Sequence, residues 1–570
     1  MLADADDGLM GVGIPRSIPG ALDRLANAVA RNSNPPRATP GIPNARRSLD
    51  STPTAGLSPI ASSTRSCSFE GPRSISNDDK FMIDLSFTPR RLCGLLSAFT
   101  ACLVSTAASV DYFADNGYGN PISTLQHPAG EHYKGVTYVA YQGPHEDPYV
   151  AAYVHATGQW IGPVQAGVSA MGKSPDQIDP GELDNHGKPA LVVDRQGYIH
   201  LVFGSHGGDP KYGPNPLGEF FMGTKGKMTH VVSVKPGDIS AWRVVDNVPV
   251  NGTYNQWVKL ANGDLYLFYR HGGHRSDWVY QHSVDDGRTF AAPVSVLKHK
   301  VSAASPTVND SWYAWFDHGR GDTITASYIY HPCANPKHNA HRQNTYYMQL
   351  DPSSGQWSNV QGARLALPVT KESADKLTLI EDTGTVRTTH GTAHVDSAGR
   401  PHLVFPAGKE VRYYRWDGKA WQKPVAVGAA GERMHDGDFV VDSPTNVRML
   451  LAQTTEAGHE IAWWNTSDGG LTWLKGAVFM ASKERSFNLS AMIRNAHPDA
   501  VMLLASRSAA EPHLYRQMHL VGAHGALVRP AAEASHLGNR LEQIKSLPPP
   551  NKDKAEAKKK KKLGLGDDDL

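Results

Sequence analysis

The 570-residue sequence predicts an all-β fold, and within that class a seven-bladed β-propeller. Two observations lead to this prediction. Short apolar strands recur through residues 110–536 at intervals of roughly 40 to 50 residues, which is the repeat length expected of propeller blades. No long amphipathic helix interrupts these strands, so alternating β and α units are not expected. The whole stretch is therefore predicted to be one folded domain.

The predicted strands are short apolar or alternating runs, many of which follow a glycine turn and end in an aromatic residue. Seven such runs occur at blade spacing: Val136–Tyr141, Tyr198–Phe203, Asp264–Tyr269, Thr323–Tyr328, Pro401–Phe405, Val447–Leu451 and Ala500–Leu504. We expect each run to supply one strand of a different blade.

Turns of one kind follow several of these strands. Ser283–Phe290 and Thr466–Trp473 match the pattern S/T-x-D-x-G-x-T-W/F, and residues 157–160, 354–357 and 417–421 are degenerate copies. The aspartate caps turn amides, the glycine takes a positive φ, and the aromatic ring fills the gap between blades. The pattern resembles the Asp boxes of BNR-repeat proteins, which indicates architecture and says little about chemistry.

The two ends of the chain differ from this folded unit. Residues 1–81 are rich in Pro, Ser, Arg and Asn, and we expect them to be disordered or an extension upstream of the natural start. Residues 82–108 have the basic, apolar and small-residue parts of a secretory signal peptide, with a buried helix of a cytosolic protein as the alternative. Residues 537–570 form a proline-containing, charge-segregated tail that we expect to be disordered and solvated.

Composition narrows the class of partner. The formal net charge is +2, with 57 basic and 55 acidic residues, so no global field favours nucleic acid or a membrane surface. Four cysteines exclude a disulfide-stapled scaffold. If residues 82–108 are a signal peptide, the mature protein is secreted and extracellular, and Cys333 is its remaining cysteine. We expect a monomer.

The second and third repeats carry an unusual set of polar residues. His186 precedes one apolar strand and His206 ends the next; Tyr254 and Arg270 occupy the matching places one repeat later. In a propeller, equivalent positions in successive blades open at the same mouth of the central channel. The sequence therefore predicts that these four side chains meet.

The runs 184–208 and 254–273 resemble the propeller polysaccharide lyases, namely ulvan lyases and fungal L-rhamnose-α-1,4-D-glucuronate lyases. The resemblance extends over most of residues 130–520. It implies that His186, His206, Tyr254 and Arg270 form the catalytic group. It also implies an acidic, ulvan-like or gum-arabic-like polysaccharide, cleaved at a rhamnosyl-(1→4)-glucuronate linkage by β-elimination.

These residue types suit that chemistry. Elimination must neutralise the uronate carboxylate, remove the proton from C5 and protonate the departing O4. Arg270 suits the carboxylate, Tyr254 can act as base and acid, and either histidine can transfer or orient a proton. Each residue alone could be structural, and the division between the histidines stays open. His145, Asn255 and Tyr313 are candidates to line the substrate cleft, or they simply cap turns.

A second cluster consists of His331, Cys333, His338 and His341. Nitrogen and sulfur donors at this spacing fit a structural zinc site, with calcium as another possibility for the metal and a histidine-rich loop around a buried thiol as the alternative. Ulvan lyases of this kind can hold a structural metal, so the resemblance agrees. No organic cofactor is expected.

Two other functions compete with the lyase. Asp boxes also occur in sialidase-like glycosidases, but no arginine triad with a nucleophilic tyrosine is apparent at a supporting spacing. A non-catalytic propeller could bind glycans through the same aromatic and arginine residues.

Overall fold

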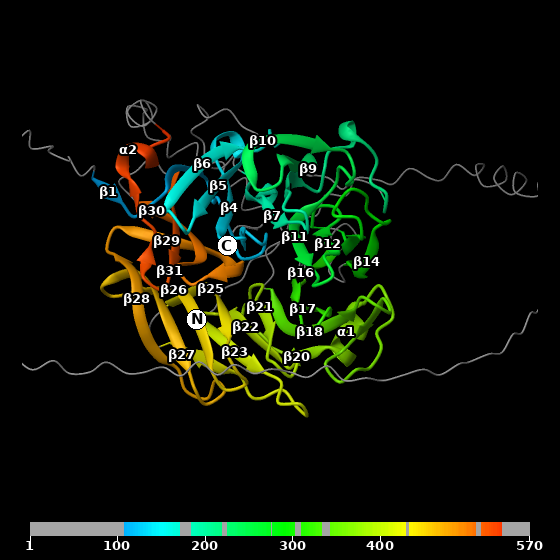
Figure 1. The fold of residues 1–570 in the computed structure, drawn as a ribbon. Helices are drawn as coiled ribbons and strands as arrows, with labels where there is room; N and C mark the ends of the chain where they lie inside the picture. The colour runs from blue at the N-terminus through cyan, green and yellow to red at the C-terminus, as the bar shows by residue number, and fades with distance from the viewer. Residues whose placement is uncertain are drawn as a thin grey trace, which may run out of the picture. The chain divides into compact units, whose positions relative to one another are not determined.

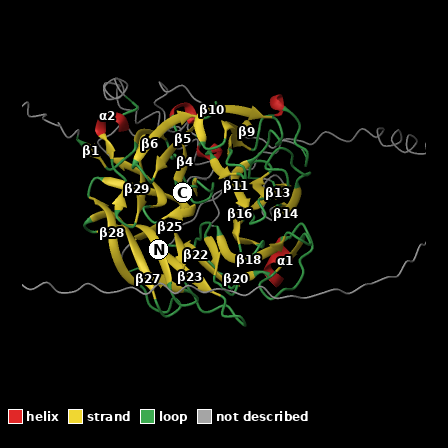
Figure 2. Cartoon of the chain, in the orientation of Figure 1, coloured by secondary structure: helices red, strands yellow, loops and turns green. Residues whose placement is uncertain are grey.

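The computed structural model describes residues 108–171, 184–218, 225–274, 276–301, 309–332, 342–428, 433–508 and 515–537. These residues are almost entirely strands and loops, which confirms the all-β prediction (Figures 1 and 2). The helices among them are α1 (Lys371–Leu377), α2 (Ala531–Ala534) and three 3-10 turns: η1 (Pro144–Glu146), η3 (Asn185–Gly187) and η4 (Pro210–Tyr212).

The strands form antiparallel groups that follow one another along the chain. The first group is β3 (Gly130–Tyr133), β4 (Val136–Gln142), β5 (Pro148–Val154) and β6 (Gln159–Gln165). The second is β7 (Ala190–Val193), β8 (Ile199–His206), β9 (Lys225–Lys235) and β10 (Asp238–Val245). The third is β11 (Thr253–Lys259), β12 (Leu265–Arg270), β13 (Trp278–Ser283) and β14 (Val294–Leu297).

The later groups repeat this order. The fourth holds β15 (Lys300–Val301), β16 (Asn309–His318), β17 (Ile324–His331), β18 (Gln343–Asp351), β19 (Gln356–Ser358) and β20 (Leu379–Glu381). The fifth is β21 (Thr392–Val395), β22 (Pro401–Ala407), β23 (Glu410–Arg415) and β24 (Val425–Val427). The sixth is β25 (Arg433–Val441), β26 (Val447–Thr455), β27 (Gly458–Thr466) and β28 (Leu474–Ser482).

The last group joins the two ends of the described chain. It contains β29 (Arg485–His497), β30 (Ala500–Ser508), β31 (Tyr515–Gly522) and β32 (Gly525–Ala526), and β31 pairs with β2 (Ala114–Tyr118). A separate pair is formed by β1 (Ser109–Val110) and β33 (Arg529–Pro530). A single parallel bridge, Arg494 to Glu131, connects this last group to the first, so the two groups share one hydrogen-bonded sheet.

Each of the seven predicted runs lies in one strand of a different group: β4, β8, β12, β17, β22, β26 and β30. The strand that pairs before each of them contacts its counterparts in the neighbouring groups. These strands, called the inner strands below, meet in the order β3, β7, β11, β16, β21, β25, β29 and back to β3. The described fold is therefore a propeller-like arrangement of sheets.

Buried and half-buried charged side chains link the inner strands near their C-terminal ends. Lys259 of β11 contacts the Glu131 carboxylate of β3 and donates to Val193 O of β7 at 2.6 Å. His394 of β21 lies between Asp438 of β25 at 2.7 Å and Asp317 of β16 at 3.4 Å. Because each charge has a partner of opposite sign, this belt of ion pairs can be buried.

The Asp boxes have the predicted geometry. Asp285 accepts from Thr289 N at 2.9 Å and Thr289 Oγ1 at 2.6 Å, and the equivalent Asp468 accepts from Thr472 N at 3.0 Å and Thr472 Oγ1 at 2.6 Å. The glycines within the two boxes have positive φ. The Trp473 ring packs on Tyr413 of the preceding sheet, with centroids 5.2 Å apart. The motif thus closes a turn and joins neighbouring sheets.

The predicted segments at the ends of the chain lie outside the described residues, except for Ala108 and Leu537. Among the helices that the structure describes, none is long and apolar enough to cross a membrane.

Candidate active site

Four predicted residues lie at the end of the sheets where the inner strands begin. His186 stands in η3, just before inner strand β7, and Tyr254 is the second residue of inner strand β11. His206 and Arg270 are the last residues of β8 and β12, the strands that run back antiparallel to β7 and β11. Antiparallel pairing brings strand starts and strand ends to one edge, which we call the mouth.

Asp184 contacts both histidines through its carboxylate. One carboxylate oxygen lies 2.5 Å from His186 Nδ1, and the other lies 3.0 Å from His206 Nδ1 and 2.8 Å from Lys225 Nζ. Burial alone would raise the pKa of Asp184, but the charges and hydrogen bonds of the two histidines hold it well below its ordinary value. Asp184 is therefore a carboxylate that fixes both rings.

The two imidazoles stack face to face, with centroids 3.7 Å apart and planes 10° apart. Burial, the neighbouring His186 and the cationic Arg270 lower the pKa of His206, although Asp184 opposes them. Hydrogen bonding of each Nδ1 to Asp184 leaves each Nε2 as the acceptor when the ring is neutral. His186 Nε2 is buried without a hydrogen-bond partner in the described part of the chain.

Tyr254 sits in a strained stretch of backbone. The β11–β12 register shifts between Thr253 and Gln256, and Tyr254 has a φ of 59°, in the region that non-glycine residues rarely adopt. Its ring lies 5.2 Å from that of His186 and 5.7 Å from that of Tyr313. Strain of this kind is kept where the surrounding structure requires a particular side-chain direction.

Arg270 is a fully buried cation. Its guanidinium carbon lies 4.9 Å from the Tyr254 ring centre and 5.4 Å from the Tyr313 ring centre. None of its three side-chain nitrogens has a hydrogen-bond partner among the residues that the structure describes. Leaving a charged donor group in this condition costs several kcal/mol, on the order of 3–5. An anionic ligand would relieve that cost.

The three residues predicted to bind substrate differ in their surroundings. Tyr313 accepts from Arg342 Nη2 at 3.2 Å and stacks near Arg270, so it belongs to the mouth. Asn255 follows Tyr254 and is fully buried, with neither amide atom paired among the described residues. His145 lies in η1, but its neighbour Glu146 makes the contact with the site, accepting from Asp184 N at 2.7 Å.

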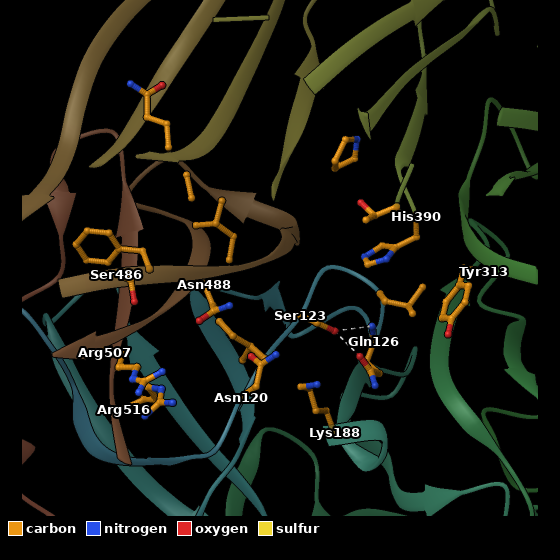
Figure 3. Close-up of a pocket in the computed structure, with 18 of the residues that line it drawn as sticks. Asn120, Ser123, Gln126, Lys188, Tyr313, His390, Ser486, Asn488, Arg507 and Arg516 are labelled. Atoms are coloured by element: carbon orange, nitrogen blue, oxygen red, sulfur yellow. Dashed lines mark hydrogen bonds between the residues drawn. The ribbon is translucent and has the colours of Figure 1, made fainter. Parts of the chain in front are cut away.

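A cavity of about 510 Å³ opens beside Tyr254 and Tyr313 (Figure 3). Five basic side chains line it: Lys188, Arg342, Arg387, Arg507 and Arg516. Its lining also includes Glu460, which pairs with Lys475. The cavity wall is thus strongly cationic, although the whole chain is nearly neutral. A pocket of this kind suits an anionic ligand.

Sequence reasoning missed these cavity residues. Lys188 follows His186 by two residues in the run 184–208, so the sequence offered a signal for it. Arg342 stands just before β18 and has no such motif beside it; the two residues meet only in the fold. His390, also on the wall, bonds Thr124 Oγ1 at 2.8 Å, and burial with the nearby Arg342 lowers its pKa to about 3. Asp184 could have been recognised, because it precedes His186 by two residues in the same run.

One group of side chains at the mouth has the donor atoms of a metal site. Asp184, His186 and His206 offer three donor atoms within 4.8 Å of one another, but Lys225 already occupies the carboxylate. Of the predicted metal ligands, His331 ends β17, while Cys333, His338 and His341 lie outside the described residues. His274, which the sequence analysis did not select, packs edge-on against His331 with centroids 4.7 Å apart.

Comparison with known proteins places these features in a class. The family model of BNR repeat-containing members matches residues 136–427. An ulvan lyase of Pseudoalteromonas sp. (strain PLSV), described as PL25, is 45% identical over 466 residues, covering 77% of this chain and 93% of that protein. An ulvan lyase of Alteromonas sp. (strain LOR) is 44% identical and covers 74% of this chain and 88% of its own length.

A solved structure of a PL25 ulvan lyase bound to -[GlcA(1-4)Rha3S]- is 43% identical, with a TM-score of 0.69; the match covers 75% of this chain and 99% of that one. The fold and these matches define a BNR-repeat polysaccharide lyase. Within that class, the chain belongs to the ulvan lyase family.

Proposed function

We propose that this lyase cleaves the rhamnosyl-(1→4)-glucuronate linkage of an acidic, ulvan-like or gum-arabic-like polysaccharide by β-elimination. The observation that carries the proposal is the buried Arg270 guanidinium between two tyrosine rings, which has no hydrogen-bond partner among the residues that the structure describes. A planar cation with free donors matches a carboxylate in two-point geometry. The cationic cavity next to it suits the rest of an anionic chain.

Arg270 binds the C6 carboxylate of the glucuronate and withdraws negative charge from it. This makes the proton on C5 more acidic, because the carbanion that forms on its removal is stabilised through the same carboxylate. Burial strengthens the effect, since the guanidinium acts in a site of low dielectric constant.

His186 acts as the base and Tyr254 as the acid. Asp184 holds His186 Nδ1, so Nε2 is directed away from the carboxylate and takes the proton from C5. The C4–O4 bond then breaks, a C4=C5 double bond forms, and the Tyr254 hydroxyl gives its proton to the departing O4. His206, stacked on His186 and bound to the same carboxylate, positions the base and assists with the substrate carboxylate.

The test is elimination itself. The purified chain is incubated with ulvan, glucuronan and gum arabic, and the ultraviolet absorbance of unsaturated uronate is followed. We expect a rise for the wild type and a loss of about 10²-fold or more for Tyr254→Phe and for His186→Asn. Tyr133→Phe is the matched control, because Tyr133 lies in β3, outside the candidate site, and its hydroxyl donates a long hydrogen bond, of 3.3 Å, to Arg195 O.

Other results would point elsewhere. Glycan binding without unsaturated product would indicate a binding protein, and new reducing ends without unsaturation would indicate hydrolysis. Full elimination activity in Tyr254→Phe would remove Tyr254 from its role as acid. A pH profile that keeps its acidic limb in His186→Asn would remove His186 as the base.

The ring is proposed to have seven blades. The closed order of contacts among seven inner strands supports this, as does the presence of one predicted run in each of the seven groups. In this interpretation the sheet that contains both β29 and β3 comprises two blades joined by one bridge. The chain is proposed to act as a monomer.

Secretion is proposed on the sequence pattern of residues 82–108. The substrate agrees, because a polysaccharide chain is met outside the cell. Mass spectrometry of protein from the culture medium should find a mature terminus near Ser109, and an intact Met1 would contradict secretion.

A structural zinc is proposed for the cluster around His331. The edge-on His274 supports it, since a second imidazole beside His331 supplies another nitrogen donor to a set that includes a thiol. These residues would hold the ion as a structural tie between β17 and the β12–β13 loop. Cys333→Ser should lower the bound zinc by one equivalent; unchanged zinc content would contradict the assignment.

A further inference from the structure

A second cluster of metal-binding side chains lies away from the mouth, where the first and last groups of strands meet. His132 belongs to β3, His155 follows β5, and His497 ends β29. Asp499 lies in the turn between β29 and β30. His132 directly follows Glu131 of the ion-pair belt, so the cluster is at the end of the inner strands opposite to the active site.

The three imidazoles pack against one another. The His155 and His497 rings are 3.8 Å apart, and the His132 ring is 5.1 Å from His155 and 5.5 Å from His497. One donor atom each from His155, His497 and Asp499 lies within 4.8 Å of the others. These side chains are half-buried, and small movements would bring each donor atom to roughly 2 Å from a shared zinc ion, the usual length of a zinc–ligand bond.

Hydrogen bonds to the surrounding protein occupy one nitrogen of each ring. The hydroxyl of Thr137, a fully buried residue, lies 3.1 Å from His132 Nδ1 and 2.8 Å from His155 Nε2. His497 Nδ1 accepts from Asp499 N at 3.2 Å. The remaining nitrogens are His132 Nε2, His155 Nδ1 and His497 Nε2. Orientation of a ligand ring through its second nitrogen is the usual support of a metal-binding histidine.

We propose that His132, His155, His497 and Asp499 bind a divalent transition-metal ion of the zinc type. Three nitrogens and one carboxylate oxygen complete a tetrahedral set for such an ion. The donors contain no sulfur, which separates this site from the cluster around His331. His524 Nε2 lies 3.7 Å from the second carboxylate oxygen of Asp499 and stays outside the set.

The position gives the ion a mechanical role. Between β29 and β3 the backbone pairing is a single parallel bridge, Arg494 to Glu131, whereas neighbouring strands within a group pair along several residues. A metal held by β3, the β5–β6 turn and the β29–β30 turn ties the first and last groups together. Because it binds the folded chain in preference to the unfolded one, it raises stability.

The experiment measures how many zinc ions each chain binds and the visible spectrum of bound Co²⁺. Chelator-treated full-length chain is loaded with excess Zn²⁺, desalted and assayed for bound metal, and a second sample is titrated with Co²⁺. We expect His155→Ala/His497→Ala to bind one equivalent less than the wild type. Co²⁺ in Cys333→Ser should still give a tetrahedral visible spectrum without a thiolate charge-transfer band, and the double variant should lose that spectrum.

Controls separate ligand loss from misfolding. His282→Ala removes a partly exposed histidine that stacks on Tyr266, and it should leave the metal content unchanged. Asp499→Asn is a milder change that keeps the size of the side chain, and it should weaken Zn²⁺ affinity about tenfold or more. Circular dichroism of every variant reports whether the sheets are formed.

The melting temperature gives a third readout. Zn²⁺ should raise the Tm of Cys333→Ser, and this rise should disappear when His155 and His497 are also replaced. Equal metal content in the wild type and in a folded His155→Ala/His497→Ala variant would overturn the proposal. So would the absence of a tetrahedral Co²⁺ spectrum in folded Cys333→Ser.

Discussion

The two ends of the inner strands differ in whether their charged side chains have partners. At their C-terminal ends, Glu131 contacts Lys259 and accepts from Val193 N at 2.8 Å, and His394 lies between two aspartates. At the mouth, Arg270 is equally buried but has no hydrogen-bond partner in the described part of the chain. The same ring of strands thus holds one end with paired charges and leaves a cation unpaired at the other.

The difference separates structural from catalytic charge. Desolvating an ion is costly, so a fold keeps a buried pair where both partners are fixed, and removing one partner is strongly destabilising. An unpaired buried ion lowers stability unless a ligand supplies the missing charge. Under the proposed function, Arg270 marks the end of the inner strands at which we expect the anionic substrate to bind; neither the fold nor the net charge indicates this end.

The largest effect should come from Arg270→Met. Because the guanidinium is proposed to stabilise charge that develops during elimination, we expect kcat/KM to fall about 10³-fold or more. Removing a buried, unpaired charge should leave the Tm unchanged or higher. Initial rates on ulvan and thermal melts measure both quantities. If Arg270→Met were much less stable but kept its activity per folded molecule, Arg270 would be a structural charge like those at the opposite end of the strands.

At the opposite end, Glu131→Gln should mainly destabilise. It leaves the largely buried Lys259 without its carboxylate, at a cost of up to about 3–5 kcal/mol in the free energy of unfolding. Activity per folded molecule should change by less than about threefold, because the pair does not touch the mouth. Urea unfolding measures the loss, and the double variant Glu131→Gln/Lys259→Met should recover part of it. A double variant as unstable as the single one would contradict the pairing argument.

The smallest effect is a dependence of stability on pH. Although burial alone would lower it, Asp438 and Asp317 raise the pKa of His394 to about 10. A pKa raised on folding adds stability that is complete below the unfolded value of about 6.5 and is lost as pH rises towards 10. Between about pH 6.5 and 8 we expect a loss of roughly 1–2 kcal/mol in the wild type. In His394→Gln this slope should be flatter, as urea unfolding at several pH values can test; an equally steep slope in the variant would assign it to another group.

Much of the fold could be predicted, because each blade carries its own local signal. All seven predicted runs lie in strands, and both full Asp boxes make their expected hydrogen bonds. The pairing of β2 with β31 and the single bridge between β29 and β3 could not, since they depend on contacts between distant parts of the chain.

The candidate active site could likewise be predicted only in part. His186, His206, Tyr254 and Arg270 could be selected because the second and third repeats place them at matching positions. Arg342, just before β18, and Arg516, in β31, were missed because they are far apart in the chain and have no neighbouring motif. The strain at Tyr254 was also invisible in the sequence, because a positive φ at tyrosine is imposed by a bulge in β11 rather than by local residue preference.

The pairing of β2 with β31 sets the order of events during synthesis. Residues 114–118 leave the ribosome early, but their partner strand, residues 515–522, follows about 400 residues later in the chain. Until then β2, the outer strand of the last sheet, has no partner strand, and its open backbone edge is available to other chains. Truncated or stalled chains of this protein should therefore aggregate more readily than the finished one.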